Sequence, residues 1–293
     1  MRLSIWPGAG QSYAAVLEQA RHAEETGWDG VWFADHFMPN VGPGEDDTGP
    51  VLECGSVVAA LAAAVPRVRI GTLVYGITYR HPAVLANMAA TVDQISDGRF
   101  VLGVGAGWQL NEHEQYGIEL GSLKVRIDRF EEALRILDGL LRTPRTTVHG
   151  DHYRVTGAVN EPKPVQQPLP LMIGAKGEKR MLRIVAERAD EWNCWGRPEF
   201  VAHKSAVLDQ HCADLGRDPK TIARTGQALT VVDGPLPADA PHVIGGSPAK
   251  LADDIAAYAG NGLDELIVPD ALLGEGAARL KAMDAIRSIV SDL

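Results

Sequence analysis

Asp35 and His36 lie side by side in the segment GVWFADHF, residues 30–37, directly after a short apolar run. A neutral imidazole can transfer protons near pH 7 or hydrogen-bond a planar ring. The carboxylate beside it could orient the imidazole or bond a ligand. In a purely structural alternative, His36 packs against Phe37 and caps the following loop. The residue types alone leave both interpretations open.

The segment LGVGAGW, residues 102–108, contains three closely spaced glycines. Gly103 and Gly105 have the spacing of a dinucleotide-binding fingerprint, but Trp108 takes the place of its third Gly or Ala. A dinucleotide site of that kind is therefore not indicated. The glycines, Gly107 among them, either let a flat ligand approach the backbone or form a tight turn.

The segment IGAKGEKR, residues 173–180, has the pattern of a strand, a turn and a helix start. Backbone N–H groups at a helix N-terminus bind phosphate, and Lys176, Lys179 and Arg180 would add positive charge. The GxxxxGK[ST] phosphate loop is absent. The pattern favours a phosphate site at this turn, and the alternative is an ordinary turn with solvated lysines.

The sequence gives little support for a metal site or for a catalytic nucleophile. His149 and His152 flank Gly150 and Asp151 without an evident third ligand, and His113 is expected in a solvated polar loop. The motifs HExxH and GxSxG are both absent. We therefore expect no metal site and no serine hydrolase.

These candidates are spread over a chain that alternates short apolar strands with helical stretches. The predicted strands are residues 2–6, 31–34, 68–74, 100–103, 171–174, 191–194, 228–232 and 266–268. The predicted helices are residues 13–26, 51–65, 82–95, 127–141, 179–188, 200–215, 249–260 and 277–290. Eight strand–helix pairs predict an α/β fold, a closed (β/α)8 barrel, with an open doubly wound sheet as the rival.

Between these pairs, a long polar loop is expected up to about residue 124, a hairpin over residues 148–155 and an extended connector over residues 161–170. Active sites of such barrels lie at the C-terminal ends of the strands. Asp35 and His36 would follow the second strand and Glu112 the fourth. Trp195 would follow the sixth. The barrel therefore predicts that polar residues scattered in sequence share one rim.

Bulk composition narrows the function classes. The 293 residues suit one barrel domain spanning 1–293, and the net charge of −10 argues against nucleic acid as a partner. No apolar run approaches the roughly 20 residues that span a bilayer, so no membrane association is expected. Cys54, Cys194 and Cys212 are widely spaced and form no CxxC pair, which fits a reducing compartment. We expect a cytoplasmic protein acting on a small molecule.

Over nearly the whole chain these segments resemble the bacterial luciferase-like superfamily. The resemblance is carried by EETGWDGVWFADHF, by VRIGTLVYGITYRHPAVLANMAATVDQISDGRFVLGVGAGW and by PLMIGAKGEKRMLRIVAERADEWN. The long middle block is the most diagnostic. Within the superfamily the chain is similar to the actinobacterial branch that depends on coenzyme F420, a deazaflavin.

The resemblance implies a luciferase-like barrel with insertions in the loops at its C-terminal face. It implies that Asp35 and His36 lie near the deazaflavin ring and that a non-prolyl cis peptide at Leu73–Val74 forms a bulge behind it. Further matches to cofactor-binding positions of the branch are Asn111, Gly174 and Ala175, with Lys176 and Gly177 adjacent. Relatives of this type are commonly homodimers.

The resemblance also implies an activity, hydride transfer between the deazaflavin and a small organic substrate. His36 would contact the ring or relay a proton, Asp35 would orient His36 or bond the cofactor, and Glu112 is a further acid/base candidate. Trp108 and Trp195 would line the substrate pocket or merely pack at the rim. Trp108 stands where the deazaflavin-dependent glucose-6-phosphate dehydrogenases carry Glu, which argues against sugar-phosphate oxidation. An FMN monooxygenase or reductase and a non-catalytic cofactor-binding member are the alternatives.

Overall fold

Eight parallel strands close into a barrel in the computed structural model, which describes residues 1–42, 45–238 and 242–292. The strands are β1 (Arg2–Trp6), β2 (Gly30–Phe33), β3 (Arg69–Thr72), β5 (Phe100–Gly105), β8 (Leu171–Gly174), β9 (Glu191–Trp195), β10 (Ala223–Gln227) and β13 (Glu265–Pro269). Each pairs in parallel with its neighbour, and pairing between β3 and β5 completes the ring. The predicted (β/α)8 barrel is confirmed.

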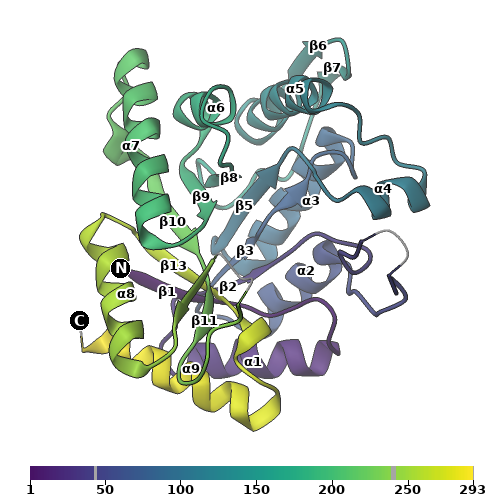
Figure 1. Ribbon diagram of the computed structural model, residues 1–293. Helices are drawn as coiled ribbons and strands as arrows, with labels where there is room; N and C mark the ends of the chain where they lie inside the picture. The colour runs from purple at the N-terminus through teal and green to yellow at the C-terminus, as the bar shows by residue number, and fades with distance from the viewer. Residues whose placement is uncertain (43–44, 239–241, 293) are drawn as a thin grey trace.

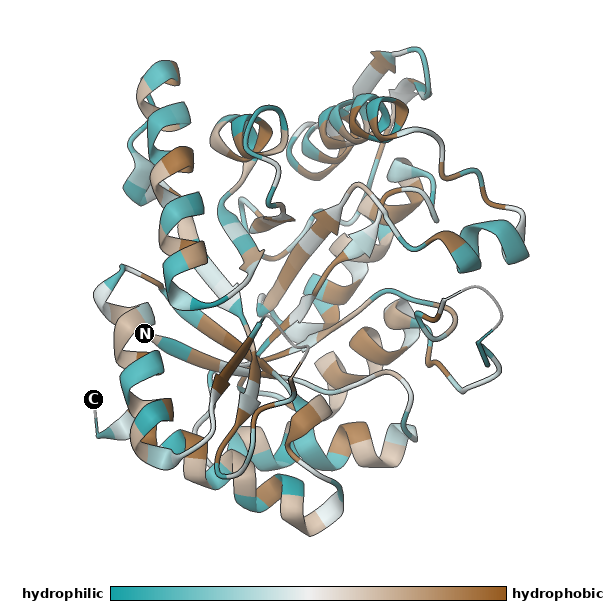
Figure 2. Ribbon diagram, in the orientation of Figure 1, coloured by the Kyte–Doolittle hydropathy of each residue, from teal (hydrophilic) through white to brown (hydrophobic). Residues whose placement is uncertain are grey.

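Helices surround this barrel (Figure 1). They are α1 (Tyr13–Glu25), α2 (Cys54–Ala64), α3 (Pro82–Ser96), α5 (Leu123–Arg142), α6 (Met181–Arg188), α7 (Pro198–Leu215), α8 (Pro248–Gly260) and α9 (Gly276–Ser291). In α5 the residues Phe130, Leu134 and Leu137 recur at helical spacing and are fully buried. Figure 2 shows the same division, with apolar residues on the strands and polar ones on the outer helix faces.

The interior of the barrel holds its own small cluster of buried side chains. Trp32, Leu73, Val101, Met172 and Ile267 form it, separate from the larger core between strands and helices. The Trp32 ring lies directly over Gly71, where an added Cβ would come within 2.1 Å of the ring. A residue without a side chain is therefore required there.

Ion pairs close the N-terminal end of the barrel. Arg69 bridges Glu265 and Glu191, and Glu265 also accepts hydrogen bonds from Ser4 Oγ at 2.6 Å and Trp32 Nε1 at 2.8 Å. The Glu265 carboxylate is fully buried and is satisfied by these partners. This end is consequently plugged, and any site for a small molecule lies at the opposite, C-terminal end.

The seventh barrel strand is not where the sequence predicts it. It is β10, and the predicted stretch 228–232 instead contains β11 (Leu229–Val231), which pairs in parallel with β12 (Val243–Gly245) outside the barrel. The prediction was wrong because β11 is the more apolar run. Arg224 in β10 is buried against Asp209 and Ser205, so tertiary partners outweigh its low strand preference.

Several loops contain structure that the sequence pattern did not indicate. The polar loop after β5 includes a short helix, α4 (Leu110–Tyr116), and the long predicted third strand ends at Thr72, before a two-residue strand β4 (Tyr75–Gly76). The cis peptide expected at Leu73–Val74 is present. The predicted hairpin is confirmed as the antiparallel pair β6 (Thr146–His149) and β7 (Arg154–Ala158).

Helix starts also differ from the prediction. The helix predicted from residue 51 begins at Cys54, because the Glu53 carboxylate caps it by accepting from the N–H groups of Gly55 and Ser56. The helix predicted from residue 179 begins at Met181. Within the described ranges, every helix is too short or too polar to cross a membrane.

Candidate active site

A cavity of about 400 Å³ opens at the C-terminal rim of the barrel. It is lined by Trp6 at the end of β1 and by residues of the loops that follow β1, β2 and β5. The lining residues are Trp6, Gly8, Ala9, Gly10, Ala34, His36, Met38, Pro39, Asn40, Pro50, Val51, Trp108 and Gln109. Its size is in the range of small-molecule sites in proteins.

His36 forms one part of the cavity wall and is bonded to a carboxylate. Its Nδ1 lies 2.9 Å from Glu112 Oε1, and its side chain is 27% exposed while that of Glu112 is fully buried. Glu112 also accepts hydrogen bonds from the Phe37 N–H at 2.8 Å and from the Tyr79 hydroxyl. Glu112 is part of the short helix α4, which follows β5. The predicted acid/base candidates His36 and Glu112 are thus in direct contact.

Glu112 is held in its ionised form. Burial alone would raise the pKa of its carboxyl, but hydrogen bonds from His36, Tyr79 and the Phe37 N–H outweigh burial, and the pKa lies below the ordinary 4.5. An ionised carboxylate only accepts hydrogen bonds, so the proton of neutral His36 is on Nδ1. The other ring nitrogen, Nε2, is therefore a free base, and it has no protein partner among the described residues.

Asp35 has a different role from the one predicted. Its carboxylate accepts two hydrogen bonds from Arg80, at 2.6 and 3.0 Å, and one from the Gly76 N–H at 2.9 Å. Burial raises the pKa of Asp35, and the bonds from Arg80 and Gly76 oppose that rise. The side chain is fully buried. The alternative in which Asp35 orients His36 is wrong, because the Asp35 carboxylate is bonded by Arg80 and Gly76 while His36 Nδ1 bonds Glu112. The alternative in which Asp35 bonds the cofactor stays a prediction.

Tyr79 and Arg80 are site residues that the sequence analysis missed. Both lie in the turn between β4 and α3. Arg80 links Asp35 to Glu53, while Tyr79 bonds Glu112 and packs edge-on against Phe37 at 4.9 Å between ring centroids. The available signal was weak, because they lie five and six residues beyond the predicted strand 68–74 rather than directly after it.

The two tryptophans differ in their distance from the cavity. Trp108 lines it, is 58% exposed and meets the His36 ring edge-on, with centroids 5.6 Å apart. Trp195 packs edge-on against Trp6 at 5.7 Å, and it is Trp6, the last residue of β1, that lines the cavity. Trp195 therefore does not line this cavity but packs against Trp6, which does.

Polar residues after β5 attach this rim to the loop that follows β2. Asn111 Nδ2 donates to the Pro39 carbonyl at 2.9 Å, and Gln109 Nε2 donates to the Met38 carbonyl at 3.0 Å. Gly107 has φ +83°, and a Cβ there would meet Thr78 Oγ1 at 2.7 Å, so glycine is required. His113, expected in a solvated loop, is instead buried in α4 and bonded to Thr78.

The turn after β8 is only partly available for a phosphate. The Ala175 N–H donates to the Asn193 carbonyl at 3.0 Å, so the expected contact from Ala175 is not available. Arg180 is paired with Asp128 and Glu131. Lys176 and Gly177 are exposed. Lys179 is exposed as well, so this turn offers a phosphate the backbone around Lys176 and Gly177 and the side chains of Lys176 and Lys179.

Leu73 and Val74 lie beneath the rim. Leu73 belongs to the interior cluster, and Val74 packs against it. A Cβ on Gly174 would lie 3.2 Å from the Val74 side chain, and one on Gly105 would lie 2.7 Å from it. These two glycines thus let Val74 pack against the ends of β5 and β8.

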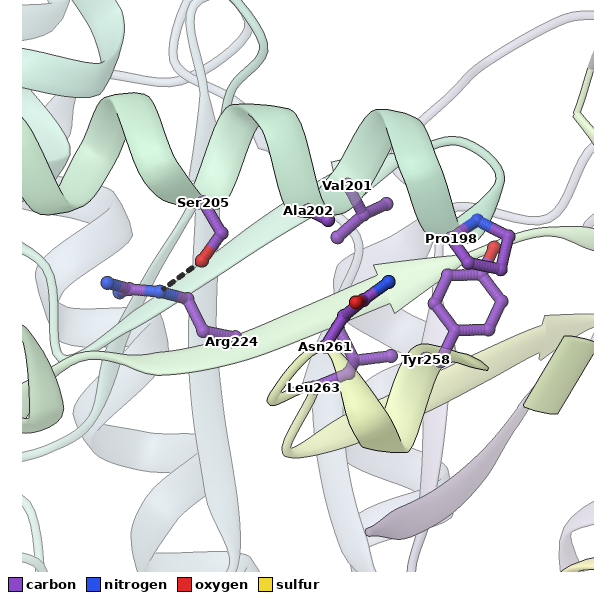
Figure 3. Close-up of a pocket in the computed structure, with 8 residues that line it drawn as sticks. All are labelled: Pro198, Val201, Ala202, Ser205, Arg224, Tyr258, Asn261 and Leu263. Atoms are coloured by element: carbon purple, nitrogen blue, oxygen red, sulfur yellow. Dashed lines mark hydrogen bonds between the residues drawn. The ribbon is translucent and has the colours of Figure 1, made fainter. Parts of the chain in front are cut away.

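A second hollow is too small to be the site. It lies between α7, α8 and β10 and has a volume of about 10 Å³, room for about one water molecule (Figure 3). Arg224 on its wall donates to Ser205 at 3.1 Å. No cluster of three His, Cys, Asp or Glu side chains with metal-binding geometry occurs among residues 1–42, 45–238 and 242–292.

The rim fits a flat polar cofactor of the flavin type. Three buried side-chain oxygens lack hydrogen-bond partners, namely Gln109 Oε1 and Asn111 Oδ1 at the start of α4 and Gln227 Oε1 at the end of β10. Buried oxygens without partners are rare in native proteins and are expected where a ligand completes the bonding. The apolar side chains of Trp6, Met38 and Trp108, which line the cavity together with Gln109, suit the faces of an aromatic ring.

A sequence model of the luciferase-like monooxygenases matches residues 1–242 of this barrel. The chain belongs to the luciferase-like monooxygenase family. It is 36% identical over 163 residues to an F420-dependent glucose-6-phosphate dehydrogenase of Amycolatopsis mediterranei, which covers 55% of the chain and 47% of that protein. The chain spans about half the length of the first curated relatives that it matches.

Solved structures of the same fold include proteins with two different cofactors, F420 and a modified FMN. An F420-dependent secondary alcohol dehydrogenase in complex with an F420-acetone adduct superposes with a TM-score of 0.86, at 20% identity and 99% coverage of both chains. A riboflavin lyase with modified FMN superposes with a TM-score of 0.82, at 14% identity, covering 100% of this chain and 91% of that one. At these identities the likeness concerns the fold.

Proposed function

We propose that this protein is an oxidoreductase that uses the deazaflavin coenzyme F420 to transfer hydride to or from a small organic substrate. The observation that carries the proposal is His36, whose Nε2 is free to accept a proton at an apolar cavity while Glu112 holds Nδ1 from behind. The named activities of the Amycolatopsis relative and of the secondary alcohol dehydrogenase support the same cofactor.

The chain's own residues would bind the cofactor, position it and handle the proton. The deazaflavin, when bound, accepts or supplies the hydride. Gln109 and Asn111 would hold its ring edge through their unpartnered oxygens, and Gly107, Leu73 and Val74 would form the surface behind the ring. Gly174, Lys176 and Gly177 would face its phosphate.

His36 would receive the proton released when a hydroxyl is oxidised, or return it in the reverse direction. The ionised Glu112 favours this step because it stabilises the imidazolium that forms. Trp108 and Trp6 would cover the reacting atoms and exclude water. Asp35 would act indirectly, by holding Arg80 and the turn that carries Tyr79.

An FMN enzyme on the same fold is the second candidate, since the riboflavin lyase with modified FMN has the same architecture. Both cofactors should be titrated into the purified protein and followed by fluorescence. Micromolar or tighter binding of F420, with weaker binding of FMN, is expected. The reverse order would refute the deazaflavin assignment and favour FMN.

A non-catalytic cofactor-binding member is distinguished by turnover. We expect His36→Ala to bind F420 within about threefold of wild type and to lose at least about 100-fold in kcat, in line with the loss of a general base. Binding without turnover of any substrate by the wild-type protein would support the non-catalytic alternative.

We further propose that residues 1–293 act as one catalytic unit in a homodimer. Leu110, Tyr116 and Leu123 are apolar and more than half exposed around α4, which fits a surface that a second copy covers. Light scattering of the purified protein tests the dimer. A monomer at micromolar concentration would contradict it.

A further inference from the structure

The cavity wall contains no positive charge in the part of the chain that the structure describes. Among its lining residues His36 is the one ionisable side chain, and none is Lys or Arg. Trp6, Met38, Val51 and Trp108 make much of the wall apolar. Recognition of a phosphate or carboxylate normally requires a cationic partner or several aligned N–H donors. No Lys or Arg among the lining residues could pair with such an anion.

Two arginines that bond residues next to the cavity lining, Asp35 and Gly107, are engaged with those partners. Arg80 is paired with Asp35 and Glu53, and its side chain is only 12% exposed. Arg126 donates to the Gly107 carbonyl at 2.7 Å. Turning either of them toward a ligand would leave a buried carboxylate or carbonyl without its partner, which is strongly unfavourable.

The loops that follow β2 and β5, which contribute Met38 and Gln109 to the lining, add negative charge. In sequence, residues 38–49, 109–124 and 234–246 contain one cation, Lys124, which pairs with Asp128. The acidic residues of the first two segments are Glu45, Asp46, Asp47, Glu112, Glu114 and Glu119. The segments 43–44 and 239–241, which lie outside the described residues, include no Lys or Arg.

Basic residues collect at another part of the rim. Lys176 and Lys179 follow β8, and Arg197 follows β9. None of the three lines the cavity. The rim is therefore polarised, with positive charge at the turns proposed to face the cofactor phosphate and negative charge around the cavity. A field of this kind attracts an anionic cofactor tail to one side and repels an anionic substrate from the other.

We propose that the substrate is an uncharged, largely apolar alcohol or its carbonyl counterpart, and that phosphorylated and carboxylated compounds are excluded. The proposal rests on the deazaflavin function above. In the oxidative direction the carbinol C–H bond breaks and its hydride passes to the oxidised deazaflavin. The O–H proton goes to His36 Nε2 and then to solvent. The products are a ketone or aldehyde and the reduced deazaflavin, so electrons and atoms balance.

The test compares cyclohexanol with trans-4-hydroxycyclohexanecarboxylate, which have the same ring and differ by one negative charge. We expect kcat/KM with oxidised F420 to be at least about 100-fold higher for cyclohexanol, because the carboxylate would lose water without gaining a cation. Glucose-6-phosphate serves as a second anion and should be turned over no faster than the carboxylate. Equal or faster turnover of either anion would overturn the proposal.

A binding measurement separates this proposal from the cofactor assignment. Trp6 and Trp108 line the cavity, so tryptophan fluorescence should respond to ligands in the protein without cofactor. Cyclohexanol should quench or shift it at concentrations at least about tenfold below the carboxylate. This result would stand even if F420 failed to bind. Equal responses, including no response to either compound, would overturn the substrate proposal.

A variant with an added cation sharpens the test. Val51 lines the cavity and is half-buried, so Val51→Lys can place an ammonium group at the wall while part of its stem stays in contact with solvent. The ratio of kcat/KM for the carboxylate to that for cyclohexanol should rise at least about tenfold. Val51→Met is the matched control for side-chain length and should leave the ratio unchanged. An unchanged ratio in Val51→Lys would contradict the charge argument.

Discussion

Replacing Glu112 by Gln tests the central contact of the site. The change keeps the shape of the side chain, but one acceptor oxygen becomes an NH2 donor. Oε2 accepts from the Phe37 N–H, which cannot rotate, so the amide oxygen of the variant is expected to stay there. The NH2 group then faces His36 Nδ1 and the Tyr79 hydroxyl, where the carboxylate accepted two hydrogen bonds.

The expected loss in the free energy of unfolding follows from these hydrogen-bond partners. Hydrogen bonds to charged groups contribute about 1.5–3 kcal/mol each, and Tyr79 can rotate its hydroxyl to accept, which recovers part of the loss. We therefore expect Glu112→Gln to lower the free energy of unfolding by about 2–4 kcal/mol. His36 would shift its proton to Nε2 in order to accept at Nδ1. That proton blocks the base that faces the cavity.

Three measurements check the prediction. Urea denaturation gives the change in unfolding free energy, and nitrogen NMR of histidine reports which ring nitrogen carries the proton. Steady-state kinetics with F420 should show a loss in kcat of about 10²–10⁴, the usual contribution of general acid–base catalysis. Glu114→Gln is the matched control, because Glu114 is exposed on the same helix. An Nδ1 proton and kcat within twofold of wild type would refute the reasoning.

Three further predictions concern stability, cofactor affinity and pH. Gly71→Ala should destabilise the fold by about 2–3 kcal/mol in urea, because its Cβ would overlap the Trp32 ring, whereas Gly260→Ala, with open space around it, should not. Lys176→Ala should weaken F420 binding about fivefold to tenfold in a fluorescence titration at low salt, and Lys220→Ala should not. The pKa of Glu112 is lowered on folding, so its stabilisation is complete above its ordinary value of 4.5 and is lost as pH falls through the lower folded value. The difference in unfolding free energy between wild type and Glu112→Gln should therefore stay constant near neutral pH and shrink below about pH 4.5; a difference that grows on acidification would contradict it.

Local pattern was sufficient for much of the architecture. Short apolar strands alternating with amphipathic helices predict a parallel sheet covered by helices, because each helix must bury its apolar face on a sheet. Eight such pairs favoured a closed (β/α)8 barrel over an open doubly wound sheet, and the pairing of β3 with β5 confirms the closure. The same alternation placed His36 at the catalytic rim, since the residue after a barrel strand always lies there. The hairpin of β6 and β7 was equally evident. The resemblance to the luciferase-like family added the cis peptide at Leu73–Val74.

Tertiary structure decided which residues act together. Glu112 reaches His36 across 76 positions of sequence, and Arg80 reaches Asp35 across 45. No local periodicity encodes these contacts, because they depend on how α4 and the turn after β4 fold over the rim. The same holds for β10, whose Arg224 is tolerated in a strand only because Asp209 and Ser205 meet it. The sequence alone predicted that His36 and Glu112 stand at the rim but did not identify Tyr79 and Arg80, and packing determined that Glu112, rather than the neighbouring Asp35, bonds His36 Nδ1.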